Sequence, residues 1–189
     1  MKRPSRYIVV FDASVLMPGF LANFLLWLAQ TDLFQAKWSG DIHADWIRNR
    51  KKRYNIELAA SKARRNVIDQ MFPDGLVTGY EGRIDSLNVN AKDRHVLATA
   101  IKCGANAIVT TNLADFPEAE LAKHHIVAIH QDDFVLDQID LTAGSARVIA
   151  AAIVVQKKSL RKSRTTWRQY FELMARPGVE LQNTYAEIS

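Results

Sequence analysis

The sequence predicts an α/β fold in which a parallel sheet is covered by helices on both faces. Short apolar stretches of strand length recur along the chain, and segments of helical length and spacing separate them. The 189 residues are 48% hydrophobic and 24% charged, which is the composition of an ordinary globular protein with a sizeable core. Strands that alternate with helices pair in parallel. We therefore expect an α/β domain over residues 1–139 and a helical C-terminal extension over residues 140–189.

Five stretches have the composition of strands. The first, YIVVF at residues 7–11, is a continuous apolar run that predicts a buried strand. A short extended piece, LVTGY, is expected within the loop-like segment that follows Pro73. The remaining predicted strands are residues 35–38, 107–111 and 126–129.

Helices are expected between and after these strands. Residues 19–30 are mostly apolar and long enough for a largely buried helix. Ser39 and Asp41 are candidate N-caps for a helix through IHADWIRNRKKRY, and Gly104 is the expected C-cap of a helix over residues 91–103. The other predicted helices cover residues 58–71, 141–156 and 165–175.

The composition also limits the compartment and the partners. The single cysteine, Cys103, excludes an internal disulfide and a CxxC metal site, and it fits a reducing compartment. Basic residues precede the first apolar run, as in a signal peptide, but Asp12 interrupts that run. No stretch approaches the roughly 18–20 apolar residues of a membrane span. We expect a cytoplasmic protein without a membrane segment. Its net charge of +5 permits a polyanionic partner without requiring one.

Four acidic residues lie near predicted strand ends and helix starts. Asp12 directly follows the first strand, and Asp115 lies a few residues after the fourth. Asp93 lies near the start of the helix between them, and Asp45 one turn into the helix after the second strand. In open parallel sheets, ligands bind outside the carboxyl ends of the strands. The four carboxylates are therefore candidates for one site.

Two explanations of these acids remain open. For Asp93 alone, interaction with the helix dipole, worth about 0.3–1 kcal/mol, is the simpler one. Asp12 has no obvious capping role, although a hydrogen-bonded structural carboxylate is an alternative. Carboxylates that meet at one edge raise each other's pKa, and a divalent cation would relieve that repulsion. Mg²⁺ and Mn²⁺ bind carboxylate oxygens and pair with phosphate substrates, so this pattern favours metal-assisted phosphoryl chemistry.

Three segments resemble the PIN domain family, and within it the VapC-like ribonuclease toxins. They are FDASVL, DIHADWIRN and AKDRHVLATAIKCGANAIVTTNLADFP. The resemblance spans about residues 7–130, and residues 93–117 are its most diagnostic part. It implies an α/β/α sandwich with a parallel sheet and endoribonuclease activity that depends on Mg²⁺ or Mn²⁺. It also implies an RNA substrate, a cognate antitoxin as partner, and a homodimer.

The resemblance assigns roles to individual residues. Asp12, Asp93 and Asp115 match the family's metal-binding acids, and Asp45 stands at the position of a fourth. Ser14 matches the family's small hydroxyl residue two places after the first acid, and Asn112 matches the polar residue of the TNLxDFP-type loop.

Asp45 departs from the family's usual pattern, which has Glu at this position. The carboxylate is therefore withdrawn by one C–C bond, about 1.5 Å, where Mg²⁺ coordination leaves little slack. A bridging water, a weakened site and an inactive one all remain open. A catalytically weakened PIN fold that binds RNA or protein is accordingly the alternative function.

Two other classes of protein begin with a similar strand. A phosphatase of the haloacid dehalogenase type requires a second Asp two residues after the first, but position 14 is Ser. A receiver domain requires clustered acids at the end of the first strand, where this chain has one. Both classes are disfavoured.

Basic residues are concentrated in two segments. Residues 48–65 contain eight Lys or Arg and one Glu, a net charge of +7, and residues 156–189 have a net charge of +4. Such clusters suit the RNA backbone, which cations contact without reading sequence. A solvated helix face is the alternative for any single lysine. The residues expected to contact RNA are Arg48, Lys51, Lys52 and Arg53.

Overall fold

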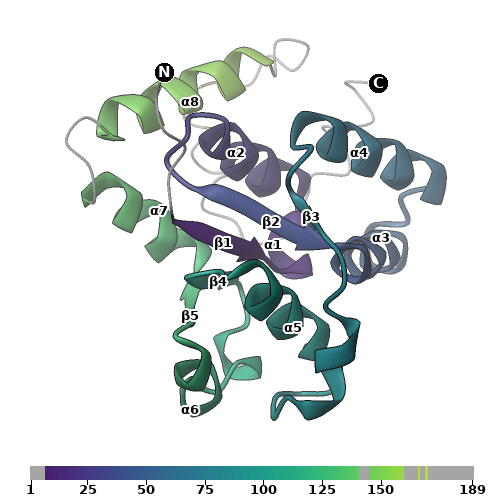
Figure 1. Ribbon diagram of the computed structural model, residues 1–189. Helices are drawn as coiled ribbons and strands as arrows, with labels where there is room; N and C mark the ends of the chain where they lie inside the picture. The colour runs from purple at the N-terminus through teal and green to yellow at the C-terminus, as the bar shows by residue number, and fades with distance from the viewer. Residues whose placement is uncertain (1–6, 141–144, 160–165, 167–168, 170–189) are drawn as a thin grey trace.

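Five parallel strands form one sheet at the centre of the protein (Figure 1). The computed structural model describes residues 7–140, 145–159, 166 and 169. The strands are β1 (Ile8–Phe11), β2 (Gln35–Ser39), β3 (Leu76–Val77), β4 (Ala107–Thr110) and β5 (Val127–His130). Their order across the sheet is β3-β2-β1-β4-β5, and every neighbouring pair is parallel. The predicted α/β fold with a parallel sheet is confirmed.

The long helices of the α/β part lie close to their predicted bounds. They are α2 (Gly19–Ala29), α3 (Gly40–Tyr54), α4 (Leu58–Met71) and α5 (Arg94–Cys103). The Ser39 hydroxyl accepts the N–H of Ile42 at 3.3 Å and so caps α3. Gly104 ends α5 in the left-handed conformation with φ of 66°, which confirms the predicted C-cap.

Several short helices and one longer helix were not predicted. The short ones are α1 (Ala13–Leu16), α6 (Glu118–Leu121) and the 3₁₀ turns η1 (Glu81–Ser86), η2 (Leu113–Asp115) and η3 (Ala122–His124). The longer one is α7 (Gln131–Asp140), whose sequence is largely acidic and polar, so that its buried face shows weakly in the pattern. Phe134 anchors α7, with its ring centroid 4.8 Å from that of Phe34. Among the helices that the structure describes, none has both the length and the apolar character needed to cross a bilayer.

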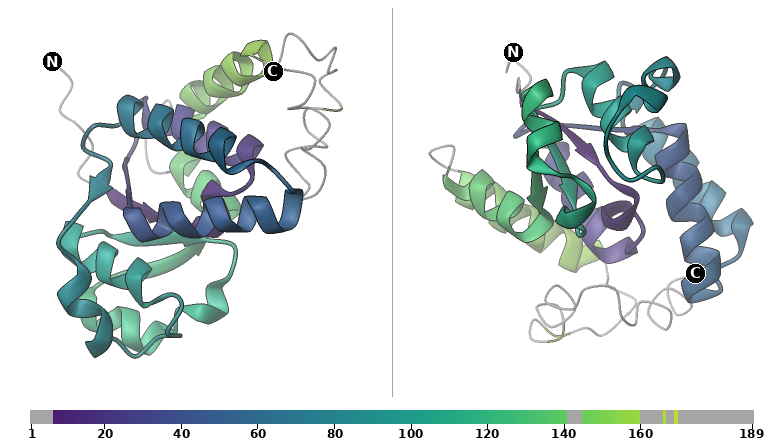
Figure 2. Two further views of the ribbon diagram at one scale, coloured as in Figure 1. Left: turned by 90° about the vertical axis from the view of Figure 1, so that its right-hand side faces the viewer. Right: turned by 90° about the horizontal axis from the view of Figure 1, so that it is seen from below.

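The helices form a layer on each side of the sheet. Helix α5 covers one face, and α2 and α7 lie on the other (Figures 1 and 2). Helix α8 (Ser145–Ser159), predicted at 141–156, packs on α2, where the Gln156 side-chain amide donates to the Phe20 carbonyl at 2.9 Å. Ile149 and Ala152 of α8 are buried in the same core as the sheet. The helix predicted at 165–175 lies outside the described residues.

Strand β1 occupies the centre of the sheet and of the core. Val9, Val10 and Phe11 are fully buried, as the continuous apolar run predicts. The chain runs from β1 to β2 and β3 on one side, then returns to β4 on the other. The carboxyl ends of β1 and β4 therefore form the topological switch point, which is where open α/β sheets bind ligands.

Candidate active site

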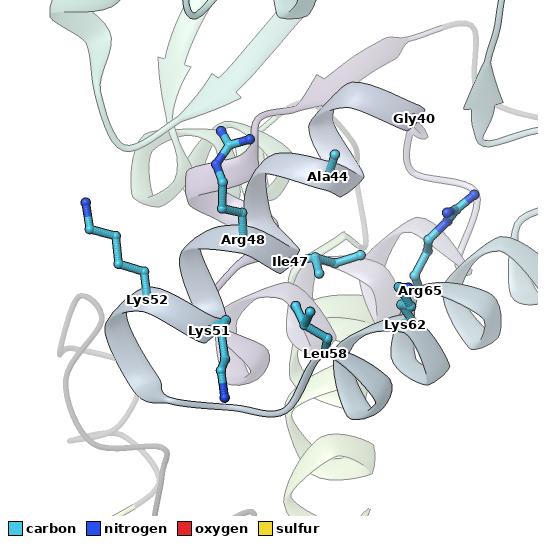
Figure 3. A pocket seen from close by; sticks show the side chains of 9 residues that line it. All are labelled: Gly40, Ala44, Ile47, Arg48, Lys51, Lys52, Leu58, Lys62 and Arg65. Atoms are coloured by element: carbon cyan, nitrogen blue, oxygen red, sulfur yellow. The ribbon is translucent and has the colours of Figure 1, made fainter.

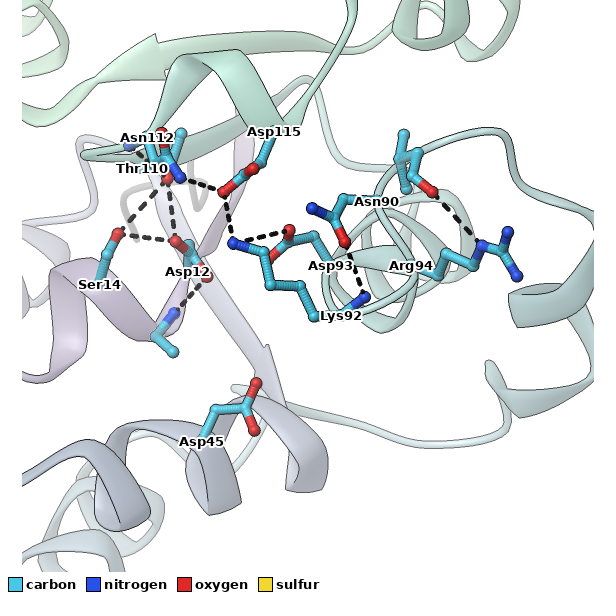
Figure 4. Close-up of polar contacts among 12 residues, drawn as sticks. Asp12, Ser14, Asp45, Asn90, Lys92, Asp93, Arg94, Thr110, Asn112 and Asp115 are labelled. Carbon is cyan, nitrogen blue, oxygen red and sulfur yellow. Dashed lines mark hydrogen bonds and ion pairs between the residues drawn. The ribbon is translucent and has the colours of Figure 1, made fainter. Parts of the chain in front are cut away.

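Asp12 lies at this switch point with both carboxylate oxygens hydrogen-bonded (Figure 4). One oxygen accepts the N–H of Ala13 at 2.6 Å, and the other accepts the hydroxyls of Ser14 at 2.6 Å and Thr110 at 2.9 Å. These bonds offset the cost of burying a residue that is only 8% exposed. Asp12 is thus the N-cap of α1, a role that the sequence did not indicate because α1 has only four residues.

Hydroxyl groups join the ends of β1 and β4. The N–H of Thr111 donates to the Ser14 hydroxyl at 3.1 Å, and the N–H of Asn112 donates to the Thr110 hydroxyl at 3.0 Å. Ser14 therefore contacts both Asp12 and the chain after β4, which fits the supporting position predicted for it. Thr110 was not singled out from the sequence. The available signal was its place as the last residue of a strand that neighbours β1.

Asp93 differs from Asp12 because its charge is only partly compensated, by the Lys92 ammonium 3.7 Å from its Oδ2. It occupies the N-cap position of α5, yet its side chain makes no capping hydrogen bond. Its buried Oδ2 has no hydrogen-bond partner among the described residues. Burial, and then the charges of Asp115 and Asp12, raise the pKa of Asp93 to about 6, against opposing effects of Lys92 and His95. Asp93 thus lies at the N-terminus of α5, where the helix dipole favours an acid, but burial and the neighbouring acids raise its pKa.

Lys92 lies between two of the acids (Figure 4). Its Nζ is 3.1 Å from Oδ2 of Asp115 and 3.7 Å from Oδ2 of Asp93. A hydrogen bond to Asp115 and the charge of Asp93 raise the pKa of Lys92. The Asn112 amide also donates to Asp115, so this predicted supporting residue contacts a predicted metal ligand. Lys92 was missed, although it directly precedes Asp93 in the sequence.

Asp45 lies on α3, apart from the other three carboxylates (Figure 4). Its Oδ1 is 2.5 Å from the Arg48 guanidinium, and its Oδ2 is 3.4 Å from Nε2 of His95 on α5. Both oxygens therefore face cationic or ionisable partners. Asp12, Asp93 and Asp115 lie around the switch point, whereas Asp45 lies apart from them and connects α3 to His95 of α5.

The donor chemistry at the switch point fits a hard divalent cation. Carboxylate oxygens are the ligands that Mg²⁺ and Mn²⁺ prefer, and the raised pKa of Asp93 reflects negative charge that Lys92 offsets only in part. As the side chains stand, no three His, Cys, Asp or Glu residues of the described chain are grouped closely enough to hold a metal. The ammonium of Lys92 instead lies against two of the acids.

The predicted RNA-contacting residues divide into two groups. Arg48, Lys51 and Lys52 line a pocket of about 580 Å³ between α3 and α4 (Figure 3). Arg53 lies elsewhere, with its guanidinium 5.7 Å from the centre of the Tyr54 ring. Three of the four cations therefore share one surface, and the first of them, Arg48, lies one turn after Asp45.

One known protein is similar to about half of this chain. A Mycobacterium tuberculosis protein named "Putative ribonuclease VapC50" is 44% identical over 86 residues, which are 43% of this chain and 51% of that protein. The chain thus spans about half the length of this relative. No family model matches the chain, and no solved structure does. The parallel α/β/α fold and this similarity confirm the predicted resemblance to VapC-like PIN proteins.

Proposed function

We propose that this protein is a metal-dependent endoribonuclease that cleaves RNA phosphodiester bonds and acts as the toxin of a toxin–antitoxin pair. The observation that carries the proposal is the position of Asp12, Asp93 and Asp115 around the switch point, where the charges of Asp115 and Asp12 raise the pKa of Asp93. The ribonuclease name of the VapC50 relative supports the same activity.

Asp12, Asp93 and Asp115 are the residues that would hold Mg²⁺ or Mn²⁺, and Asp45 would act at most through a water. When bound, the cation would supply activation of a water and stabilisation of the charge that develops on the phosphate. Either ion fits the proposal, since both accept the same oxygen ligands.

The surrounding residues position these acids. The Ser14 and Thr110 hydroxyls fix the orientation of Asp12, and the Asn112 amide fixes that of Asp115. Hydrogen bonds from such neighbouring residues orient the side chains that bind a metal. The basic side chains of α3 would contact the RNA backbone and direct the substrate to the acidic edge.

The partners follow from the same proposal. The substrate is RNA, and a cognate antitoxin would block the site in the cytoplasm. A homodimer of this chain is the proposed assembly. Each of these statements extends the resemblance to VapC-like toxins, and each is open to direct test.

The proposal is tested by incubating purified protein with single-stranded RNA and Mn²⁺, with and without EDTA. We expect cleavage by the wild type, loss of cleavage in EDTA, and no cleavage by Asp12→Asn. Circular dichroism of the variant controls for its folding, because Asp12 also caps α1. RNA binding without cleavage by either protein would contradict the proposed activity.

One observation favours the alternative of a catalytically weakened site that binds RNA. Asp45, the residue that departs from the family's usual Glu, bonds Arg48 and faces His95 instead of joining the other acids. In that case the wild type would bind RNA and cleave slowly, and Asp45→Glu would increase the rate.

A further inference from the structure

We propose that the groove between α3 and α4 is a nucleotide-binding subsite, in which one base of a single-stranded RNA packs on Ile47 and Leu58. The adjoining phosphates would lie on the surrounding lysine and arginine side chains. This inference rests on the proposed ribonuclease function and adds to it the position and the chemistry of a base contact.

The floor of the groove is apolar and partly open. Ile47 of α3 and Leu58 of α4 lie close together between the two helices (Figure 3). Leu58 is 46% exposed at the first residue of its helix, while Ile47 is nearly buried. A volume of about 580 Å³ is within the usual range of small-ligand pockets, so that it has room for a nucleotide.

The rim of the groove is cationic. Arg48, Lys51 and Lys52 come from α3, and Lys62 and Arg65 come from α4, while no acidic side chain of the described chain lines the groove. Some of this charge is neutralised by acids outside the groove, as in the 2.7 Å pair of Lys51 with Glu57. Within the described part of the chain, Lys52 and Lys62 form no ion pair and are available to an anion.

The groove adjoins Asp45 through Arg48. Arg48 lines the groove and also bonds Asp45, which faces His95 beside the acidic cluster. Three residues of helix separate Asp45 from Arg48, about 4.5 Å along the axis of α3. An RNA strand held at the acidic edge would therefore enter this groove with the next nucleotides of its chain.

A base fits this groove better than an acidic helical peptide does. A docked helix needs apolar anchors spread over two or more turns. The floor offers one compact patch, since Val67 and Met71, the other large exposed apolar side chains of α4 besides Leu58, do not line it. A flat ring with a phosphate on either side matches one apolar patch and a cationic rim.

The test measures binding by fluorescence anisotropy in EDTA, where no cleavage occurs. The probes are labelled octamers of uridylate and adenylate, and an abasic octamer that keeps the ribose–phosphate backbone. Leu58→Gln removes the apolar contact, and Leu136→Gln on α7 is its matched control, because Leu136 is exposed and lies outside the groove. Lys62→Gln is compared with Arg147→Gln, which removes the same charge from an exposed residue of α8 that does not line the groove.

We expect the wild type to bind the abasic octamer about 5-fold more weakly than the octamers with bases. Leu58→Gln should abolish that difference, and Leu136→Gln should retain it. Lys62→Gln should weaken all octamers and reduce the slope of log K against log salt by about 0.7, the value for one contact to a single strand. Arg147→Gln should have a smaller effect.

Equal binding of abasic and base-containing octamers by the wild type would overturn the subsite. So would a Leu58-dependent affinity for an acidic amphipathic peptide without base discrimination, which would assign the groove to a protein partner. The proposed function is tested separately. Base-dependent binding without cleavage in Mn²⁺ would support the subsite and contradict the proposed nuclease activity. Cleavage without base discrimination would support the nuclease activity and contradict the subsite.

Discussion

The ammonium of Lys92 lies 3.1 Å from Oδ2 of Asp115, at the position where a cation can neutralise the acids of the switch point. The same ammonium is 3.7 Å from Asp93, so one flexible side chain serves two carboxylates. Lys92 itself is largely exposed and can withdraw into solvent. This relationship makes Lys92 a competitor of any divalent cation that binds Asp93 and Asp115.

Removing Lys92 should therefore strengthen metal binding. For Lys92→Gln we expect the dissociation constant for Mn²⁺ to fall about 3- to 10-fold at low salt, because the ion no longer displaces a positive charge. Titration calorimetry measures this without RNA. Lys102→Gln removes one charge from the other end of α5 and should leave the constant unchanged. Unchanged or weaker Mn²⁺ binding by Lys92→Gln would show that the two cations do not compete.

Asp93→Asn should stabilise the metal-free protein while abolishing cleavage. The folded-state pKa of about 6 exceeds the ordinary 3.8, so the folded protein binds more protons between these values and its stability falls as pH rises through 6. A pKa difference of 1 between the folded and unfolded states corresponds to about 1.4 kcal/mol of stability, and solvent screening reduces this energy. We therefore expect Asp93→Asn to raise the free energy of unfolding by about 1–2 kcal/mol at pH 7.5. Urea unfolding in EDTA measures the gain, which should shrink by pH 5.

Asp12→Asn is the matched comparison for that experiment. Asp12 bonds two hydroxyls and caps α1, so we expect this variant to lose about 1–3 kcal/mol of stability. Opposite signs of the stability change would distinguish the carboxylate of Asp12, which accepts hydrogen bonds at both oxygens, from that of Asp93, whose buried Oδ2 accepts none from the described residues. If Asp93→Asn were the less stable variant, burying the charged Asp93 carboxylate would not reduce the stability of the protein.

Buried His43 makes stability sensitive to acid. The Trp46 indole N–H donates to its Nδ1 at 2.8 Å, so Nδ1 is unprotonated and Nε2 donates to Asp69 at 2.9 Å. Burial lowers the pKa of His43 below 6.5, although Asp69 opposes this. Its contribution to stability is therefore complete above about pH 6.5 and declines as pH falls below it.

The pH dependence is best measured in the Asp93→Asn background, where the opposite effect of Asp93 is absent. There the unfolding free energy should fall between pH 7 and pH 5, and His43→Gln should flatten that slope while lowering stability throughout. An unchanged slope in His43→Gln would assign the acid sensitivity to another group.

Asp45 should matter less for cleavage than the three gathered acids. Since Asp45 contacts Arg48 and His95, we expect Asp45→Asn to slow single-turnover cleavage by less than about 10-fold. Asp45→Glu should speed it if the longer side chain reaches the metal. Abolition of cleavage by Asp45→Asn would place this residue among the ligands after all.

Helix α8 should behave as part of the α/β core. Ile149 is buried in the same cluster as the sheet residues, so Ile149→Ala should cost about 2–4 kcal/mol of unfolding free energy. The exposed Leu136 on α7 is the control, and its replacement by Ala should change stability by less than about 0.5 kcal/mol. A small effect at Ile149 would support an extension that is separate from residues 1–139.

Elements with strong apolar patterns could be predicted from the sequence. The YIVVF run predicted the strand that became β1, and α4 begins and ends where its apolar spacing and Pro73 indicate. Helix α7 was not predicted, because its burial depends on Phe134 and a few polar residues that meet the core only in three dimensions. The one-turn helices carry too few residues to show any period.

The acids of the site could be found by their position at strand and helix ends, but their contacts could not. Thr110 and Ser14 meet because β1 and β4 are neighbours, a pairing of residues 96 positions apart. The bridging position of Lys92 and the separation of Asp45 depend on side-chain directions that no spacing encodes. The resemblance to VapC-like toxins predicted the roles of these residues, and the structure shows which of them contact one another.

The central claim is that Asp12, Asp93 and Asp115 form a metal-dependent site for RNA cleavage. Its most direct test is single-turnover cleavage of a single-stranded RNA in Mn²⁺ by the wild type and by Asp93→Asn, the variant expected to be the more stable protein. We predict cleavage by the wild type and a loss of at least 100-fold, about 2.7 kcal/mol or more, in the variant. Equal cleavage by the two proteins, or none by the wild type with RNA bound, would contradict the claim.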